Sequence, residues 1–422
     1  MTLHRNQLLG LASAIERVAR LDMPADAALS ALFRHHGEMG ARDRAFVADG
    51  AFAYLRRKAS LEALAQTTDA RLLAYAVAVR EFGHSVRDID AAINAADARW
   101  LAGFKSRMHD PLAPAVAADV PDWLWHRLGE SYDDKARASL TRAWQSPAPL
   151  DLRANTLKTT RDEALAALIS DDLPVKPTPY SPTGLRIDGR PSLARHPWLL
   201  DGRLEVQDEG SQLVALLVAP RRTDMVVDFG AGAGGKTLLL GAIMRSQGRL
   251  YAFDTSAKRL ARLTPRLARS GLSNVHPQVV ASERDAKVKR LAGKIDRVLV
   301  DAPCTGLGTL RRNPDLKWRQ TPEDLAELTA KQASILAAAA TLVKPGGRLV
   351  YATCSVLPEE NDAIVDAFLA RNPAFEERDV ATVLADSRMA LDTGSRLRLR
   401  PDVHGCDGFF AAVLERKQGE TA

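Results

Sequence analysis

The stretch DFGAGAGGKT at residues 228–237 connects a short apolar run to a segment of helical character. Glycine lets a backbone turn tightly and approach a ligand closely, and the first turn of a helix offers unpaired N–H groups. Asp254 ends the next apolar run, where nucleoside-binding folds place the acid that binds ribose hydroxyls. Strand, glycine-rich loop, helix, strand and terminal acid in this order predict a site for NAD, FAD or S-adenosylmethionine.

Short apolar runs alternate with helical stretches from about residue 206 onward. The expected strands, each closed by an acid or a small residue, are 225–228, 250–254, 298–301 and 348–353, and the expected helices include 258–270 and 324–343. This alternation predicts an α/β fold, in which helices cover both faces of a mostly parallel sheet. Ligands bind such sheets beyond the carboxyl ends of the strands.

The chain divides into three expected parts. Residues 1–130 are predicted to be helical, because apolar residues recur at helical spacing, as in Leu8, Leu11, Ile15 and Val18. Residues 131–205 mix helical and strand patterns around the breaker SPAP at 146–149, which predicts a small α+β subdomain. Residues 206–422 form the predicted Rossmann-like domain.

Composition narrows the class of protein. With 422 residues, of which 46% are hydrophobic, the chain has enough apolar surface for folded cores. No apolar run reaches 18 residues and no signal-peptide pattern is seen, so we expect neither a membrane partner nor secretion. Cys304, Cys354 and Cys406 are too few and too odd in number for a disulfide framework, which favours a reducing cytoplasm.

The charge balance permits a polyanionic partner without identifying one. The net charge is +6 and the isoelectric point is near 9.2. Arg396, Arg398 and Arg400 alternate, so on a strand their guanidinium groups would share one face. Phosphate contact and a solvated basic edge are both open interpretations of this pattern.

A phosphate-binding loop is an alternative interpretation of the glycine-rich stretch, because Gly230, Gly235, Lys236 and Thr237 satisfy the pattern G-x-x-x-x-G-K-[ST]. Two cysteine motifs argue against it. Cys304 follows one expected strand in DAPCTG, and Cys354 follows another in YATCS. Nucleotide hydrolysis has no use for two thiols at the ligand-binding edge. No histidine or further cysteine lies at ligand spacing, so we expect no metal.

At these motifs the sequence resembles the bacterial rRNA cytosine-5 methyltransferases of the RsmB (Sun) type and their Nop/Sun relatives. The matching strings are RAN at 153–155, QDEGSQ at 207–212, DAPC at 301–304, RRNPDLKW at 311–318, YATCSVLPEEN at 351–361 and DGFF at 407–410. In the helical region, ARDR at 41–44 and YLRR at 54–57 resemble the NusB-like RNA-binding domain of the RsmB type. The resemblance implies a monomeric RNA methyltransferase, with small-subunit (16S) rRNA as substrate and an RNA-contacting linking subdomain.

The resemblance also implies roles for individual residues. The loop residues Gly230, Ala231, Gly232, Ala233, Gly234, Gly235 and Lys236 would cradle S-adenosylmethionine. Asp254 would bind its ribose, and Asp301 would border the cofactor and contact the cytosine. The family loop reads A-A-P-G-G-K, so Gly232 and Ala233 replace its Ala-Pro step, and we expect a looser loop here. Either Glu283 or Asp285 could serve the adenine end.

The expected chemistry explains the need for two thiols and an acid. Carbon-5 of cytosine becomes nucleophilic after a thiolate adds at carbon-6, a role assigned to Cys354. An acid at the ring nitrogen, Asp301, stabilises the addition, with Lys236 near the reacting groups. Cys304 then removes the carbon-5 proton so that the thiol can leave. The base must be unstacked, which favours an unpaired or loop cytosine.

Two other functions remain open at this point. A DNA cytosine-5 methyltransferase would use Cys304 as the nucleophile and Cys354 as an accessory group. An RNA-binding ribosome-assembly factor with a silent methyltransferase fold would use neither thiol chemically. Methyl transfer to RNA separates these interpretations.

Overall fold

The computed structural model describes residues 3–90, 92–189, 191–387 and 389–418. They form two compact units. The helical unit consists of residues Met1–Pro147 and Thr309–Pro322, and the sheet unit consists of Ala148–Gly308 and Glu323–Ala422. Each unit is described by itself. None of the described helices is long and apolar enough to cross a membrane.

The helical unit packs around its first and fifth helices, which contact each other. Its helices are α1 (Arg5–Ala19), α2 (Ala25–His35), α3 (Ala41–Arg56), α4 (Lys58–Ala65), α5 (Ala70–Arg80), α6 (Val86–Asp90), α7 (Ala95–Arg107), α8 (Pro114–Ala117), α9 (Asp122–Ser131), α10 (Asp134–Trp144) and α17 (Leu316–Arg319). The apolar residues of α1 recur every three or four positions, so one stripe is buried against α3 and α5. The predicted all-helical N-terminal region is confirmed.

A segment from the distal part of the sequence completes this unit. Residues 309–322 contain the whole RRNPDLKW string and pack beside the end of α3. Lys317 Nζ donates to the Arg56 carbonyl at 2.9 Å, and Trp318 Nε1 donates to the Leu55 carbonyl at 2.7 Å. Complete burial lowers the pKa of Lys317 to about 7. Residues 131–147 also group with the helical unit, whereas the division at 130 and 205 stays a prediction.

The first part of the sheet unit is a small antiparallel sheet. Its strands β1 (Leu150–Ala154), β2 (Val175–Pro177), β3 (Gly184–Ile187) and β4 (Leu204–Val206) have the order β2-β3-β1-β4. Helices α11 (Arg161–Ser170) and α12 (Pro197–Leu200) accompany them. Leu168 of α11 and Leu152, Leu185 and Leu204 of the sheet are buried in one core. The predicted small α+β element is therefore present.

The larger sheet forms the Rossmann-like part. Its strands are β5 (Met225–Phe229), β6 (Arg249–Asp254), β7 (Val275–Val279), β8 (Ile295–Asp301), β9 (Val343–Thr353), β10 (Phe375–Arg378), β11 (Leu397–Leu399) and β12 (Phe409–Arg416). The order is β10-β12-β9-β8-β5-β6-β7, with β11 paired to β12. Strands β5 to β9 are parallel, and β12 and β10 add antiparallel edges.

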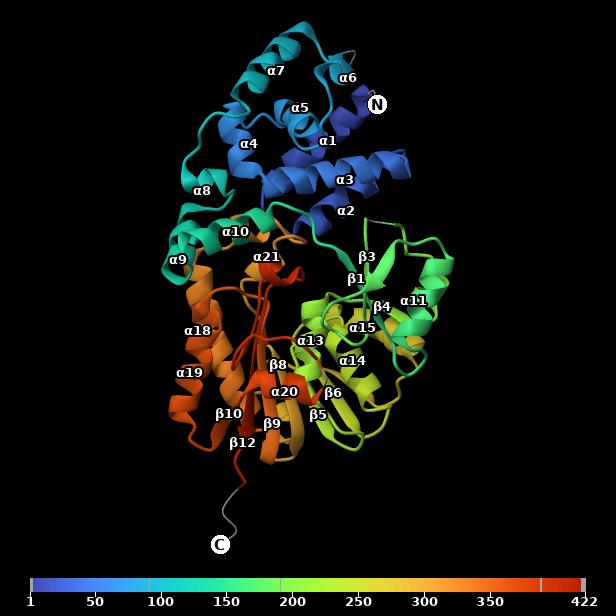
Figure 1. Cartoon of the computed structure of the whole chain (residues 1–422), viewed down its shortest axis with the longest axis vertical. Helices are drawn as coiled ribbons and strands as arrows, with labels where there is room; N and C mark the ends of the chain where they lie inside the picture. Colours follow the sequence, from blue (N-terminus) through green and yellow to red (C-terminus); the bar gives the residue numbers. More distant parts are fainter. Residues whose placement is uncertain (1–2, 91, 190, 388, 419–422) are drawn as a thin grey trace. The chain divides into compact units, whose positions relative to one another are not determined.

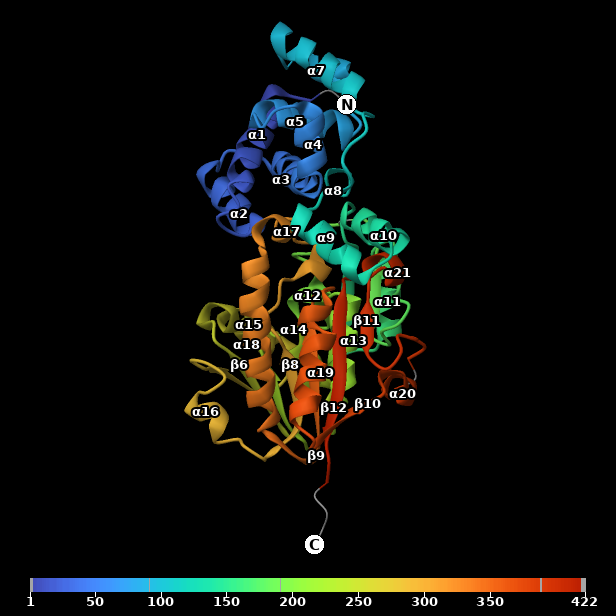
Figure 2. The ribbon, with the colours of Figure 1, turned by 90° about the vertical axis from the view of Figure 1, so that its left-hand side faces the viewer.

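Helices cover both faces of this sheet (Figures 1 and 2). The helices of this part of the chain are α13 (Glu209–Val218), α14 (Gly235–Ile243), α15 (Ala257–Ser270), α16 (Ala286–Lys289), α18 (Pro322–Ala340), α19 (Asp362–Arg371), α20 (Val380–Asp386) and α21 (Pro401–His404). Successive strand residues enter different cores: Val226 packs with α13 to α15, and Val227 packs with α18 and α19. Because both faces are buried, the strands read as continuous apolar runs.

One expected helix boundary is wrong. The helix predicted over 324–343 ends at Ala340, and β9 begins at Val343, which pairs with Ile295. Pro345 lacks the N–H that a helix needs, and Gly346 has a φ of +74°, so the chain turns into a strand here. Apolar periodicity alone did not separate the helix end from the strand start.

Candidate active site

The candidate site residues lie at the carboxyl ends of the strands of the large sheet. Strands β5 and β8 are neighbours at its centre, and the chain continues from β5 to β6 on one side and from β8 to β9 on the other. This reversal of strand order is where open parallel sheets bind ligands. The glycine-rich loop, Asp254, Asp301 and Cys354 end or follow four of these strands.

The glycine-rich loop has a conformation that only glycine adopts easily. Gly230 and Gly234 have φ values of +92° and +84°. A Cβ on Gly230 would lie 2.4 Å from the Asp301 carbonyl oxygen, and one on Gly234 would lie 2.2 Å from Leu263. The Gly230 and Ala231 N–H groups both donate to the Phe253 carbonyl at 2.9 Å. The loop is thus pressed against the ends of β6 and β8.

Asp254 directly supports this loop. Its side chain is buried, and Oδ2 accepts a hydrogen bond from the Gly232 N–H at 2.9 Å. Oδ1 accepts from the Ser256 N–H at 2.7 Å and lies 3.2 Å from an Arg259 guanidinium nitrogen. Each carboxylate oxygen thus accepts one backbone hydrogen bond and has a further lone pair that could accept from a ligand hydroxyl beside the loop.

Two arginines reach the loop from outside. Arg266 donates to the Ala233 carbonyl at 2.6 Å and is held by Glu205 at 2.9 Å. Arg153, from the RAN string, donates to the Gly235 carbonyl at 2.9 Å. Ala233 stands where the resembling loops have a proline. The two guanidinium groups restrain the loop at Ala233 and at Gly235. The sequence alone did not reveal these contacts, because the partners come from β1 and α15.

Thr237 and Lys236 do not point as a phosphate-binding loop would need. The Thr237 hydroxyl donates to Asp228 Oδ2 at 2.6 Å. Burial raises the pKa of Asp228 to about 7, although the Thr237 hydrogen bond opposes this, and Asp228 Oδ1 has no partner among the described residues. Lys236 donates to Asp301 Oδ2 at 2.8 Å. Both side chains face neighbouring acids, which disfavours the nucleotide-hydrolase alternative.

The Lys236–Asp301 pair is partly shielded from solvent. Burial lowers the pKa of Lys236, but the charge and hydrogen bond of Asp301 outweigh it, so the net pKa is raised. The Lys236 nitrogen also lies 5.2 Å from the centroid of the Phe409 ring, which belongs to the DGFF string. An ammonium and a carboxylate are thus available together at the ends of β5 and β8.

The two cysteines lie side by side although they are 50 residues apart in the sequence. Their sulfur atoms are 3.3 Å apart, and both residues are partly exposed. The hydrogen bond with Cys354, together with burial, raises the pKa of Cys304, which keeps its proton. A protonated thiol beside a second sulfur can stabilise a thiolate there. Cys406, the third cysteine, is buried elsewhere in the apolar core.

Glu283 and Asp285 both lie in the connection between β7 and α16. Glu283 accepts a hydrogen bond from Ser334 at 2.8 Å, which lowers the pKa of Glu283. Asp285 accepts from the Ala281 and Lys287 N–H groups at 2.8 Å, and these bonds lower the pKa of Asp285. Asp285 therefore caps α16. The role of either acid at the adenine end stays a prediction.

The alternating arginines bind carboxylates. Arg396 is buried and contacts Asp362 at 2.7 Å, Asp366 at 2.6 Å and Glu377 at 2.6 Å. Arg398 also contacts Asp362 at 2.6 Å, and Arg400 contacts Asp402 at 2.6 Å. Acids thus neutralise this basic face, which favours a structural role over phosphate contact.

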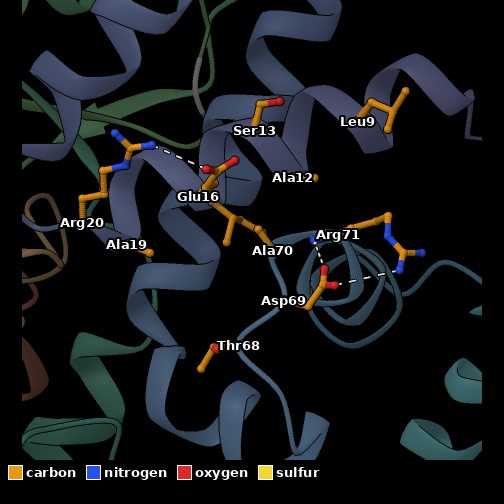
Figure 3. Close-up of a pocket in the computed structure, with 11 residues that line it drawn as sticks. Leu9, Ala12, Ser13, Glu16, Ala19, Arg20, Thr68, Asp69, Ala70 and Arg71 are labelled. Carbon is orange, nitrogen blue, oxygen red and sulfur yellow. Dashed lines mark hydrogen bonds and ion pairs between the residues drawn. The ribbon is translucent and has the colours of Figure 1, made fainter.

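The helical unit contains a separate groove of about 770 Å³ between α1 and the start of α5 (Figure 3). Its charged side chains are paired: Arg20 lies 3.5 Å from Glu16, and Arg71 contacts Asp97 and lies 3.9 Å from Asp69. Because these cations already have acidic partners, the groove has no marked preference for an anion.

Comparison with known proteins identifies the family. The profile described as "16S rRNA methyltransferase RsmB/F" matches residues 215–415. The chain is 35% identical over 318 residues to the ribosomal RNA small subunit methyltransferase B of Sodalis glossinidius, covering 74% of this chain and 70% of that protein. The chain belongs to the RsmB/F family of 16S rRNA methyltransferases.

Further comparisons agree with this RsmB/F membership. A RsmF/B-like ferredoxin-like domain profile matches residues 120–194. The probable ribosomal RNA small subunit methyltransferase B of Synechocystis sp. is 36% identical over 300 residues, and the match covers 70% of this chain but 66% of that protein. The crystal structure of PH0851 has a TM-score of 0.79 and 25% identity, covering 99% of this chain and 100% of that one. The predicted family and fold class are confirmed.

Several residues of the candidate site were not singled out from the sequence. Glu360 contacts the residues that follow both cysteines, and Arg153, Arg266 and Phe409 contact the loop or Lys236. Glu360, Arg153 and Phe409 lie within strings that match the family. The matching strings could have marked these three residues as candidates. Their contacts could not be predicted, because the partner residues lie on other strands and helices.

Proposed function

We propose that this chain transfers a methyl group from S-adenosylmethionine to carbon-5 of a cytosine in 16S rRNA through a covalent adduct on Cys354. The 3.3 Å approach of the Cys304 and Cys354 sulfurs, beside the Lys236–Asp301 pair, carries this proposal. Labelled methyl transfer to 16S rRNA, with bisulfite sequencing of rRNA from a deletion strain, tests both the reaction and the target nucleotide.

The loop fits the proposed cofactor. A Cβ on Gly232 would have nothing nearer than the Gly230 carbonyl oxygen at 3.9 Å, so the backbone is open on this side. The buried, unpartnered Asp228 Oδ1 offers an additional acceptor at the loop. Residues 230–236 and Asp254 would hold the methionine and ribose parts, and the bound cofactor would supply an electrophilic methyl group.

The residues of the chain then act in three steps: addition, methyl transfer and elimination. The Cys354 thiolate forms an S–C6 bond to the cytosine as the C5=C6 π bond breaks. Asp301, oriented by Lys236, acts as the acid that stabilises the negative charge developing at the ring nitrogen. Carbon-5 gains the methyl group as a new C–C bond, and the bond that would break is the sulfonium S–CH3 bond of the cofactor, which would leave as a neutral thioether. In the adduct Cys354 is a neutral thioether, so the neighbouring sulfur that held the proton on Cys304 no longer does so, and Cys304 releases that proton to solvent. The Cys304 thiolate then takes the carbon-5 proton, and the electron pair of the broken C–H bond expels the Cys354 sulfur to restore the aromatic ring.

Asp254→Ala is expected to weaken S-adenosylmethionine binding by at least about tenfold, because charge-assisted hydrogen bonds contribute about 1.5–3 kcal/mol each. Titration calorimetry measures the affinity directly. Asp254 also holds the Gly232 N–H, so Asp254→Asn, which keeps a hydrogen-bond acceptor, is the matched control and should lose less. Unchanged cofactor affinity in Asp254→Ala would remove this residue from the site.

The helical unit is expected to contribute phosphate contacts to RNA binding. Arg34 and Arg42, at the end of α2 and the start of α3, are exposed and form no ion pair in the described part of the chain. Reversing both charges should weaken RNA binding and reduce the salt dependence of the affinity by roughly one phosphate contact per arginine.

Filter binding of 16S rRNA at several salt concentrations measures this effect. Arg20, which is exposed but paired with Glu16, provides the matched control for charge reversal. Deleting the whole unit is a poorer test, because residues 309–322 would lose their packing partners. If the affinity of the wild type and of the Arg34/Arg42 variant depended equally on salt concentration, the helical unit would have only a structural role.

A further inference from the structure

Glu360 holds the residues that directly follow both cysteines. Its side chain is fully buried in the short helical turn Pro358–Glu360 after β9. Oε1 accepts from the Thr305 N–H at 2.8 Å, and Oε2 accepts from the Thr305 hydroxyl at 2.6 Å. Oε2 also accepts from the Ser355 hydroxyl. One carboxylate therefore joins the loop after β8 to the loop after β9.

The surrounding contacts keep Glu360 itself in place. Gln332 of α18 donates to Oε1 at 3.0 Å and to the Pro303 carbonyl at 2.9 Å, so it binds both the acid and the residue before Cys304. The Tyr351 hydroxyl donates to the Glu360 carbonyl at 2.7 Å. The neighbouring Asn361 donates to the Ser355 carbonyl at 3.1 Å. These bonds attach Glu360 and Asn361 to α18, to β9 and to a residue that follows Cys354.

The choice of an acid at this position is informative. A buried carboxylate is expensive to desolvate, and it is usually compensated by a cation. Glu360 forms no ion pair among the residues that the structure describes; its partners are an N–H group, an amide and two hydroxyls. An apolar side chain here would leave the buried Thr305 N–H and the Gln332 amide without this acceptor, so the position needs a side chain that hydrogen-bonds to both loops.

We propose that Glu360 is a positioning residue that sets the spacing of the Cys304 and Cys354 sulfurs. This inference rests on the proposed covalent function. Attack on the cytosine needs one sulfur, whereas elimination also needs Cys304 at the correct distance from the adduct. Loss of Glu360 should therefore slow release of the methylated RNA more than it slows attack.

The first test measures the sulfur spacing without any RNA. Phenylarsine oxide bridges two neighbouring thiols, forming two As–S bonds as its oxygen leaves with both thiol protons as water. The wild type should bind one equivalent by mass spectrometry, and Cys304→Ala should bind at least tenfold more weakly. Glu360→Ala should also bind at least tenfold more weakly. Glu360→Gln should bind like the wild type, because both hydroxyls can rotate to accept from its amide.

The second test follows the adduct on denaturing gels with 16S rRNA. Glu360→Ala should prolong the adduct lifetime at least tenfold, and Glu360→Gln should restore most of the release. Glu209→Ala is the matched control: Glu209 is equally buried and binds the Tyr180 and Ser181 N–H groups, not the residues that follow Cys304 and Cys354. If Glu360→Ala does not fold, Thr305→Val/Ser355→Ala removes the hydroxyl ties and should show the same two effects.

The outcomes separate the two proposals. If neither the wild type nor Cys304→Ala forms an adduct, the covalent function fails, while weakened arsenical binding by Glu360→Ala would still support its effect on spacing. Wild-type arsenical binding and adduct lifetime in Glu360→Ala, alongside a persistent adduct in Cys304→Ala, would overturn the inference about Glu360.

Discussion

Cys354→Ala is expected to abolish both methyl transfer and the covalent enzyme–RNA species, whereas Cys304→Ala should methylate once and then remain joined to the RNA. The reason is the division of labour between two sulfurs 3.3 Å apart. Without Cys354 nothing adds to carbon-6, and without Cys304 no base removes the carbon-5 proton. A slowly migrating protein–RNA band on a denaturing gel, with labelled methyl in it, measures the difference.

The asymmetry itself excludes the competing interpretations. Two thiols with only structural roles would destabilise the protein modestly and similarly on truncation, and neither variant would trap RNA. A DNA-type enzyme would reverse the pattern, so that the adduct persists in Cys354→Ala alone. A silent methyltransferase fold predicts no methyl transfer even by the wild type. Cys406→Ala, which changes a buried cysteine in the apolar core, is the control for thiol loss.

Asp301→Ala is expected to lower the methylation rate by roughly 10²–10³-fold, the usual effect of removing one preorganised group at a developing charge. Adduct formation should slow by a similar factor, because the acid at the ring nitrogen promotes addition at carbon-6. This distinguishes Asp301 from Cys304. Lys236 would lose the partner that lies 2.8 Å away, so the free energy of unfolding should fall by about 1–3 kcal/mol.

The double variant Lys236→Met/Asp301→Ala separates stability from chemistry. Removing both partners leaves no unpaired buried ammonium, so much of the stability should return while activity stays low. Urea denaturation measures the stability, and single-turnover methyl transfer measures the rate. Normal adduct formation by Asp301→Ala would assign ring activation to another group.

Much of the fold follows from local patterns. The strand ends at Asp254 and Asp301 and the glycine-rich loop were predictable, because an apolar run closed by an acid and a loop with several glycines are features of neighbouring residues. The boundary between α18 and β9 was not, since an apolar stretch suits either element until a proline and a left-handed glycine interrupt it.

The candidate site was predictable as a list of residues but not as a set of contacts. The sequence placed Cys304 and Cys354 at the ends of separate strands, and their 3.3 Å approach depends on β8 and β9 being parallel neighbours. The restraint of Ala233 by Arg266 was also absent from the sequence pattern. A missing proline predicted a looser loop, and a side chain from α15 supplies a contact that no local rule encodes.

By itself, the sequence determined the order of elements, the α/β class, the glycine-rich loop and the family strings, since periodicity and turn chemistry act over a few neighbouring residues. Only the tertiary structure decided which strand lies beside which. It also decided that residues 309–322 complete the helical unit and that Glu360 serves both cysteine loops. Such pairings depend on strand order and on the burial of polar groups, which must find partners wherever the completed fold brings donors together.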